Sequence, residues 1–323
     1  MTSETLSVVI PNWNGEPFLR GCLSSLLRQT APPQQILVVD NASSDESVAL
    51  IRRDYPQVEL LCLPSNRGFA GGVNAGIERA RGSLVALFNQ DAEADPSWAA
   101  ALMEAAKAHP EAGAFASKIV LFDPVDHFHS AGDLYCQDGV AANRGVWQRD
   151  TGQYDDESYV FGACGAAAVY RREVFDRVGL FDEAFFMYYE DVDMAWRHQI
   201  AGWPTLYVPG ALVYHHLGAS GGGVVASYFG ARNTIYVLAR DVPTPLLARY
   251  WRPIVKRQLQ IAWEALRAWR GSAARARLRG LAAGLVTWPR MWRQRQVIQS
   301  SRQVSVEYLD SLLSPIDEGT SAD

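Results

Sequence analysis

Apolar runs and segments with helical spacing alternate along the first hundred residues. The buried runs "LSVVIPNW", "QQILVVDNAS", "VELLCLPSN" and "SLVALFNQDAE" predict four strands. The segments between them, "EPFLRGCLSSLLRQT", "SDESVALIRRDY" and "GFAGGVNAGIERA", predict helices. Strands that alternate with helices over short connections are typical of an α/β protein, with a mostly parallel, Rossmann-like sheet and flanking helices.

The rest of the chain is patterned less regularly. A helix is expected over 95–109, strand-like runs lie within 112–123 and 158–175, and the last strand is expected over 204–216. After about residue 227 the pattern is mostly helical. We therefore divide the chain into an α/β domain over 1–235 and a basic, mostly helical C-terminal segment over 236–323.

Polar residues stand where the predicted parallel strands end, and ligands of such sheets bind outside these carboxyl ends. The candidates are Asn12 to Asn14, Asp40 to Asp45, Asn66 to Arg67, and Asn89 to Asp91. Asn89 and Asp91 are two residues apart on an extended segment, so they point the same way. Their oxygens suit Mg²⁺ or Mn²⁺. A solvated loop is the alternative reading of this segment.

Two further strand ends carry weaker signals. Asp40 either binds a ribose or base edge or caps the following helix through "DNASSD". The stretch "NRGFAGGVNAGI" either cradles phosphate or only permits close helix packing, and it matches neither GxGxxG nor a P-loop. Arg67 is the more specific candidate for binding a diphosphate.

The stretch "FFMYYEDVDMAWR" brings three acids directly behind aromatic residues. If a helix begins near Asp191, Asp193 and Arg197 pair on its solvent side. Glu190 and Asp191 then lie at its N-terminus, where the helix dipole favours negative charge. Asp191 is suited to act as a general base, or it is merely an N-cap.

His215 and His216 follow the last predicted strand. Alternation along the strand points the two side chains in opposite directions. One is expected to be packed and the other to be a ligand, and the sequence leaves open which is which.

Charge is divided unevenly along the 323 residues. Residues 240–302 carry 14 Lys/Arg and 2 acids, a net charge of +12, whereas the rest of the chain carries −17. Tryptophans and aliphatic residues interleave with these arginines, and the longest uncharged run has only ten residues, against about 20 for a membrane span. The pattern favours contact with an anionic membrane surface over an ordinary helical subdomain or an oligomer contact. The acidic body and the lack of a nucleic-acid motif argue against nucleic acid.

The location of the protein is read from its start and its cysteines. The first strand begins at Leu6, so no secretory signal is expected, and the four scattered cysteines favour a reducing cytosol. A cytoplasmic protein at the inner face of the membrane is the prediction.

Six motifs taken together resemble the family 2 glycosyltransferases with the GT-A fold. They are "VVIPNWNG", "ILVVDNASSDES", "NRGFAGGVNAGI", "FNQDAE", "GACGAAAVYRREVFDRVGLFDEAFFMYYEDVDMAWR" and "HHLGAS", in the family's order over roughly residues 6–235. "NQDA" stands where the family has its DxD-type motif, with Asn89 in place of the first acid and Gln90 where proline is more usual. The N-x-D motif, the long glycine-rich loop and the H-x-x-G-x-S tail look most like rhamnosyltransferases that use dTDP-L-rhamnose.

The resemblance implies an inverting, metal-dependent hexosyltransferase of cell-surface polysaccharide synthesis, acting on a glycan or lipid-linked acceptor. The resemblance implies that Pro11, Asn12 and Asn14 line the nucleotide pocket, with Asn89 and Gln90 nearby, and that Asp40 contacts the base or ribose. It also implies that Arg67 lies by the diphosphate and that Asp91 binds Mg²⁺ or Mn²⁺ with His216. Asp191 is then the catalytic base, with Glu190 on the acceptor side. Two rival hypotheses remain: a nicotinamide-dependent oxidoreductase, disfavoured by the missing GxGxxG, and a non-catalytic, membrane-associated sugar-nucleotide binder.

Overall fold

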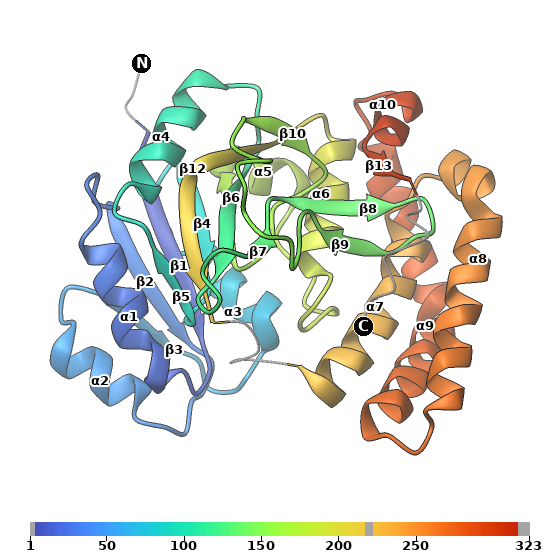
Figure 1. The fold of residues 1–323 in the computed structure, drawn as a ribbon, viewed down its shortest axis with the longest axis horizontal. Helices are drawn as coiled ribbons and strands as arrows, with labels where there is room; N and C mark the ends of the chain where they lie inside the picture. Colours follow the sequence, from blue (N-terminus) through green and yellow to red (C-terminus); the bar gives the residue numbers. More distant parts are fainter. Residues whose placement is uncertain (1–3, 217–221, 316–323) are drawn as a thin grey trace.

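A large mixed sheet forms the centre of the protein (Figure 1). The computed structural model describes residues 4–216 and 222–315. The main strand order is β10-β12-β6-β11-β4-β1-β2-β3, with β5 paired to β12 and β7 to β6. These strands are β1 (Leu6–Asn12), β2 (Gln35–Asp40), β3 (Glu59–Cys62), β4 (Leu84–Phe88), β5 (Ala92–Ala94), β6 (Ala114–Leu121), β7 (Phe128–Ser130), β10 (Ser158–Val160), β11 (Ala167–Arg171) and β12 (Thr205–His215).

The first four predicted strands form a parallel block, as expected. β1 pairs in parallel with β2 and β4, and β2 pairs in parallel with β3. The register places Asn12 opposite Asp40, so the polar residues that follow the two strands emerge at one edge. The parallel order follows from the helices that return the chain between strands: α1 (Glu16–Leu27), α2 (Ser47–Asp54) and α3 (Gly68–Ile77).

The later strands make the sheet mixed. β11 lies between β4 and β6 and runs antiparallel to both, whereas β12 runs parallel to β6. α1, α2 and α4 (Trp98–Ala108) pack on one face of the sheet. α3 packs on the other face with α5 (Arg172–Val178) and residues from α6 (Glu190–Ile200). A second, small sheet of β8 (Asp133–Cys136), β9 (Ala141–Asn143) and β13 (Leu313–Ser314) was not expected from the sequence.

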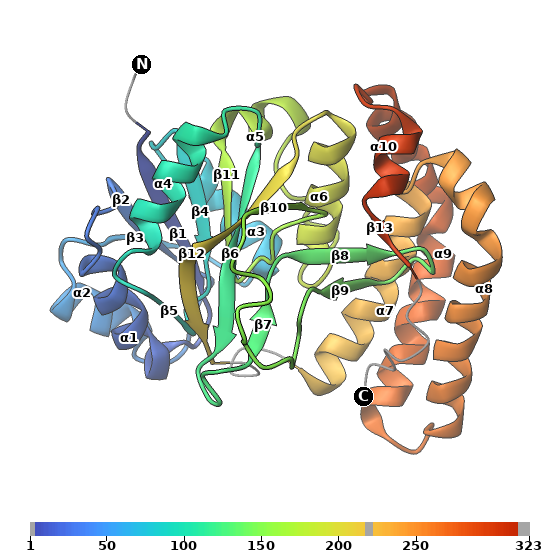
Figure 2. The same cartoon turned by 45° about the horizontal axis from the view of Figure 1, so that its top comes forward.

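The C-terminal helices form a layer beside α6 (Figure 2). They are α7 (Gly223–Arg240), α8 (Thr244–Arg267), α9 (Ser272–Ser300) and α10 (Val306–Ser311). α7 and α9 approach closely at two glycines of α9. A Cβ on Gly280 would lie 2.2 Å from the Tyr228 carbonyl oxygen, and a Cβ on Gly284 would lie 2.7 Å from Ile235 Cβ. The predicted boundary at 235/236 falls inside α7, and the two-part division itself stays a prediction. Within the described residues, no helix is long and apolar enough to cross a membrane.

Candidate active site

The ends of β1 and β2 are tied together by a network around Asn12. Asn12 Nδ2 donates to Asp40 Oδ1 at 2.9 Å and to Ser43 Oγ at 3.1 Å. Asp40 Oδ2 accepts from the Ser43 N–H at 3.1 Å, and Asn14 Oδ1 accepts from the Ser44 N–H at 2.8 Å. Asp40 and Asn12 are fully buried. Both residues therefore shape the loop after β2, and their predicted contact with a nucleotide stays a prediction.

Gln90 holds the chain that leaves β1. Its Oε1 accepts from the Trp13 N–H at 2.8 Å and its Nε2 donates to the Trp13 carbonyl at 3.3 Å. A Cβ on Gly15 would lie 2.4 Å from both Gln90 Oε1 and Asn12 Oδ1, so any other residue at this position would displace these two side chains. The Trp13 side chain is 51% exposed beside this clamp. Pro11 lies in β1 opposite Val39, within reach of α3.

Asn89 and Asp91 converge on one imidazole nitrogen, but not on the extended segment that was expected: the Ala92 N–H donates to the Asn89 carbonyl at 3.2 Å and closes a turn. His215 Nε2 lies 3.3 Å from Asn89 Nδ2 and 3.2 Å from Asp91 Oδ1. The His129 ring from β7 stacks on the His215 ring, with centroids 4.8 Å apart and planes 9° apart. Burial, together with the neighbouring His215, lowers the pKa of His129 to about 3, so this ring is neutral at pH 7.

His216 contacts different residues from His215, as alternation predicts. Its Nε2 lies 3.7 Å from Glu93 Oε1, and its ring stacks on Phe122 at 3.7 Å between centroids. His215 rather than His216 therefore stands beside the Asp91 carboxylate. The predicted role of His216 as a metal ligand stays a prediction. The H-x-x-G-x-S tail continues into residues 217–221, which lie outside the described part of the chain.

Asp91 and His215 make a small donor set for a cation. Asp91 is 1% exposed, and His215 Nδ1 is buried with no hydrogen-bond partner among the described residues. Those residues include no group of three or more His, Cys, Asp or Glu side chains placed to hold a metal. Mg²⁺ is usually held by one or two carboxylates together with substrate phosphates rather than by a complete protein cage. The set therefore fits a cation that shares its ligands with a diphosphate.

Arg67 stands at the N-terminus of α3 with its guanidinium paired to Glu183. Both side chains are about two-fifths exposed, so the pair is open to exchange with an anion. The start of α3 also contacts the aromatic stretch, because the Ala70 N–H donates to the Phe186 carbonyl at 3.2 Å. The predicted contact of Arg67 with a diphosphate remains untested.

The aromatic stretch before Glu190 is held in an unusual conformation. Phe186, Tyr188 and Tyr189 have φ between 64° and 68°, a backbone conformation that residues other than glycine rarely adopt. Asn233 of α7 stabilises it: its Nδ2 lies 3.0 Å from the carbonyls of Phe185 and Met187 and 2.6 Å from that of Tyr188. The C-terminal layer thus shapes the loop that leads into the acid cluster.

Asp191 and Glu190 begin α6, as predicted, in different surroundings. Asp191 Oδ2 accepts from the Gly165 N–H at 3.0 Å, and its Oδ1 accepts from the Val192 N–H at 2.8 Å. Burial raises the pKa of Asp191, although these N–H bonds oppose the shift. Burial raises the pKa of Glu190 well above its usual value, and the charge on Asp191 raises it further. Asp191 is therefore the acid of the two that ionises more readily.

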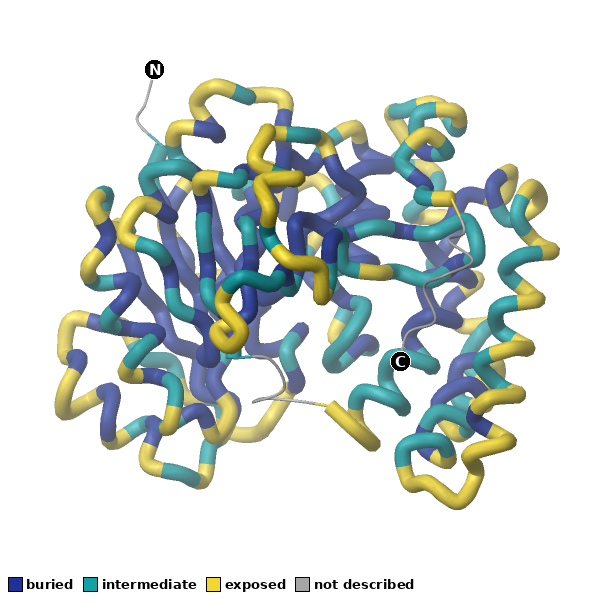
Figure 3. The backbone as a smooth tube through the Cα atoms, viewed as in Figure 1, coloured by how far each residue is buried: buried dark blue, intermediate teal, exposed yellow. Residues whose placement is uncertain are grey.

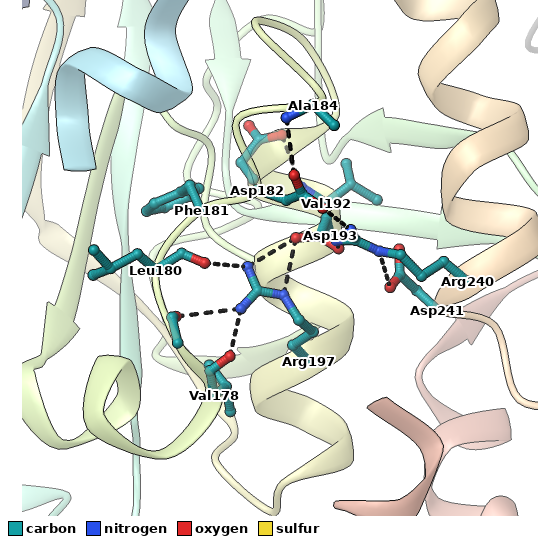
Figure 4. Close-up of polar contacts among 12 residues, drawn as sticks. Val178, Leu180, Phe181, Asp182, Ala184, Val192, Asp193, Arg197, Arg240 and Asp241 are labelled. Atoms are coloured by element: carbon teal, nitrogen blue, oxygen red, sulfur yellow. Dashed lines mark hydrogen bonds and ion pairs between the residues drawn. The ribbon is translucent and has the colours of Figure 1, made fainter. Parts of the chain in front are cut away.

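Asp193 and Arg197 pair, but the expectation that they face solvent is wrong. Arg197 Nη2 lies 2.8 Å from Asp193 Oδ2, and both side chains are buried (Figure 4). Arg197 also donates to the carbonyls of Val178 and Leu180, while Arg240 of α7 pairs with the second Asp193 oxygen. The turn before the aromatic stretch and the C-terminal layer cover this side of α6, which the helix pattern alone could not reveal.

One short loop connects the Asp91 side to the Asp191 side. The Asn89 N–H donates to the Ala166 carbonyl at 2.9 Å, and the neighbouring Gly165 N–H donates to Asp191 at 3.0 Å. The ladder between β4 and β11 begins directly beyond, with Phe88 opposite Ala167. Asn89 and Asp191 are therefore hydrogen-bonded to the adjacent residues Ala166 and Gly165, which bring the two predicted functional ends close to each other.

Comparison with known proteins identifies the family. A family model described as glycosyl transferase family 2 matches residues 7–179. The chain belongs to this family. It is 31% identical over 264 residues to N-acetylglucosaminyl-diphospho-decaprenol L-rhamnosyltransferase of Mycobacterium tuberculosis (strain ATCC 25618 / H37Rv), a match that covers 74% of this chain and 85% of that relative. The predicted family is confirmed, and nothing supports the oxidoreductase alternative.

Solved glycosyltransferases share the fold of this family 2 transferase. GalNAc-T7 with UDP, GalNAc and Mn²⁺ superposes with a TM-score of 0.60 at 16% identity, covering 74% of this chain and 48% of that protein. S. aureus TarS 1–349 superposes with a TM-score of 0.56 at 14% identity, covering 92% of this chain and 90% of that one. At these identities the likeness shows the fold alone, and it confirms the predicted GT-A architecture.

Several polar residues of this transferase that meet the candidate site were missed in the sequence. His129 stacks beside Asp91, Asn233 holds the aromatic stretch, and Asp133 is buried close enough to Asp191 for their charges to interact. Each comes from a segment that sequence reasoning left without a functional role. The "HSAGD" stretch offered one usable signal, a histidine and an aspartate four residues apart in an otherwise small, weakly patterned segment.

Proposed function

We propose that this glycosyltransferase moves L-rhamnose from dTDP-L-rhamnose to a hydroxyl of a lipid-linked glycan, with inversion at the anomeric carbon, in cell-surface polysaccharide synthesis. The observation that carries the proposal is the short connection from Asn89 through Gly165–Ala166 to Asp191. This short connection supports a shared site for the diphosphate, the cation and the base. The rhamnosyltransferase relative, whose name specifies a diphospho-decaprenol acceptor, supports the choice of sugar and acceptor.

Asp191 performs the proton transfer in this proposal. Its carboxylate is fixed by two backbone N–H bonds and removes the proton from the acceptor hydroxyl as that oxygen attacks the anomeric carbon. The bond from that carbon to the diphosphate breaks as the new glycosidic bond forms. A single displacement with one base on the face opposite the leaving group inverts the configuration.

The donor end is held by the strand ends. Asn12, Asn14 and Asp40 order the loops after β1 and β2 that receive the nucleotide, and Arg67 exchanges Glu183 for the diphosphate. Asp91, with His215, would hold a divalent cation, which offsets negative charge on the departing diphosphate when bound. His216 remains the alternative second ligand.

Transfer should depend on donor and cation together. With dTDP-L-rhamnose and a synthetic prenyl-diphosphate N-acetylglucosamine, we expect product with Mg²⁺ or Mn²⁺ and at least a tenfold loss of rate in EDTA, restored by added cation. Product is measured by mass spectrometry, with UDP-glucose and GDP-mannose as control donors. Unchanged rates in EDTA would remove the cation from the proposal, and donor binding without turnover would support the non-catalytic binder.

The outer side of α8 suits an anionic membrane surface. Figures 1 and 3 place α8 at the edge of the molecule away from the central sheet, with much of its outer side exposed. Large apolar residues recur on it at helical spacing: Trp251, Val255, Leu259, Trp263 and Leu266, all at least 47% exposed. Exposed basic residues stand next to them: Arg252, Lys256, Arg267 and Arg270. This apolar stripe with flanking positive charge supports a peripheral position at the inner face of the membrane, where a lipid-linked acceptor lies.

Replacing two stripe residues should weaken vesicle binding. In Leu259→Glu/Trp263→Glu we expect at least tenfold weaker binding to phosphatidylglycerol-containing vesicles, because the change removes apolar area and adds negative charge. Co-sedimentation measures it, and wild-type binding should weaken with salt. Trp147→Ala, which changes an exposed tryptophan whose backbone N–H donates to the Phe128 carbonyl of β7, is the control. Unchanged vesicle binding combined with the loss of a wild-type dimer would show that the stripe is an oligomer contact instead.

A further inference from the structure

The segment from His129 to Asp133 connects the two ends of the site by a second route. His129 stacks on His215 beside Asp91, and Asp133, four residues on, begins β8 near Asp191. Four residues of extended chain span at most about 14 Å. Unlike the Gly165–Ala166 connection, this route ends in a buried carboxyl group that the proposed reaction does not yet use.

Asp133 holds the loop that binds Asp191. Its N–H donates to the Gly162 carbonyl at 2.9 Å, and its Oδ1 accepts from Asn143 Nδ2 at 2.8 Å. Its side chain also packs on Gly162, where an added Cβ would lie 3.7 Å from Asp133 Cβ and 4.0 Å from Asp133 Oδ2. Asp133 thus fixes the chain at Gly162, three residues before the Gly165 N–H that donates to Asp191.

The same loop lies directly on α6. A Cβ on Gly162 would lie 2.8 Å from Ala195 Cβ, and one on Gly165 would lie 3.3 Å from Asp191 Oδ2. Neither glycine leaves room for a side chain without movement of its neighbour. A change in the position of the loop would therefore shift the Asp191 carboxylate, because the loop and α6 are in direct contact at Gly162 and Gly165.

The charges around this pair favour one ionised carboxyl group. Burial raises the pKa of Asp133 well above its usual value, and the charge of Asp191 raises it further, while Asn143 and Ser130 oppose the shift. The other titratable groups that face the pair are Glu190, Cys164, Tyr170 and Tyr189, and none of them carries a positive charge. Two carboxylates in such a site resist simultaneous ionisation.

We propose that Asp133 is a positioning residue for the transfer reaction, which fixes the Gly162–Gly165 loop and, through it, the carboxylate of Asp191. The inference rests on the proposed function, in which Asp191 is the base. Asp133 stays protonated while Asp191 is ionised, so it acts as a neutral hydrogen-bonding group and not as a second charge. An amide of the same shape can replace such a group, whereas a methyl group cannot.

The kinetic test compares Asp133→Asn with Asp133→Ala. In Asp133→Ala we expect kcat to fall by about ten- to a hundredfold while KM for the donor stays unchanged, because the base is misplaced but the nucleotide loops are not touched. In Asp133→Asn we expect kcat within about threefold of wild type. Asp138→Asn, on the same hairpin, is the matched control and should behave as wild type. A folded Asp133→Ala with wild-type kcat, or an Asp133→Asn as slow as the alanine variant, overturns the inference.

A stability measurement tests the same group without turnover. A carboxyl whose pKa is raised in the folded state contributes most below its unfolded pKa, and its contribution falls as pH rises toward the folded value. Asp133→Asn should therefore gain stability relative to wild type between pH 4.5 and pH 7.5 in chemical denaturation. A pH-independent difference would show that Asp133 is not held protonated. If wild type transfers no sugar, the proposed function fails, and this measurement still decides whether Asp133 is a neutral group.

Discussion

Asp191→Asn should lower kcat by about a thousandfold, within the range of about 10²–10⁴ that a positioned general base contributes. An amide oxygen still accepts the 3.0 Å bond from the Gly165 N–H, while the bond from the Val192 N–H is lost, because an amide NH2 group cannot accept it. The variant also loses the ability to take a proton from the acceptor. The affinity for dTDP-L-rhamnose, measured by calorimetry, should stay within about twofold of wild type, and transfer is measured as product formed per second at saturating donor.

The pH profile separates loss of the base from general damage. Because burial raises the pKa of Asp191, wild-type kcat should fall on the acidic side as pH drops through that raised value and the carboxylate is protonated. Asp191→Asn has no such group and should show a flat acidic limb. Asp176→Asn, an exposed change on α5, is the control and should match wild type. Full activity in Asp191→Asn would remove this residue from the mechanism.

The parallel half of the sheet could be predicted because its signals are local. β1, β2 and β4 are fully or almost fully buried runs, and each helix between them carries an apolar face in its own sequence. β7 and β9 have three residues each, too few to show a period. β11 is an apolar run whose antiparallel direction depends on pairing with β4 and β6, about 80 and 50 residues earlier in the chain.

The site divides in the same way. Asn12, Asp40, Asn89 and Asp91 could be predicted to lie at one edge, because the strands of a parallel sheet end at the same edge, a rule that needs no side-chain contacts. Asp133 depends on the β8 hairpin folding under α6, and Asn233 depends on α7 returning to the aromatic stretch. The solvent side expected for Asp193 was likewise an inference from one isolated helix.

Arg240→Met should be the most destabilising single change outside the sheet, at about 3–5 kcal/mol. Arg240 is 3% exposed, pairs with Asp193 and Asp182, and its Nε lies 3.2 Å from Asp241 Oδ1 (Figure 4). Methionine fills similar space but leaves these buried carboxylates short of positive charge. The free energy of unfolding is measured by chemical denaturation at pH 7.5, with Arg249→Met, which breaks only an exposed pair with Asp310, expected to cost no more than about 1 kcal/mol.

The pH dependence of this loss identifies its cause. Burial already raises the pKa of Asp241 to about 6 while Arg240 and Arg197 oppose the shift, so removing Arg240 raises it further. A carboxyl with a raised folded pKa costs stability above its unfolded pKa and recovers as pH falls through the folded value, so the deficit of Arg240→Met should shrink between pH 7.5 and pH 5. A deficit that does not change with pH would attribute the effect to packing, for example over the Phe185 ring. A variant as stable as wild type would show that the ion pair between Arg240 and Asp193 does not hold α7 against α6.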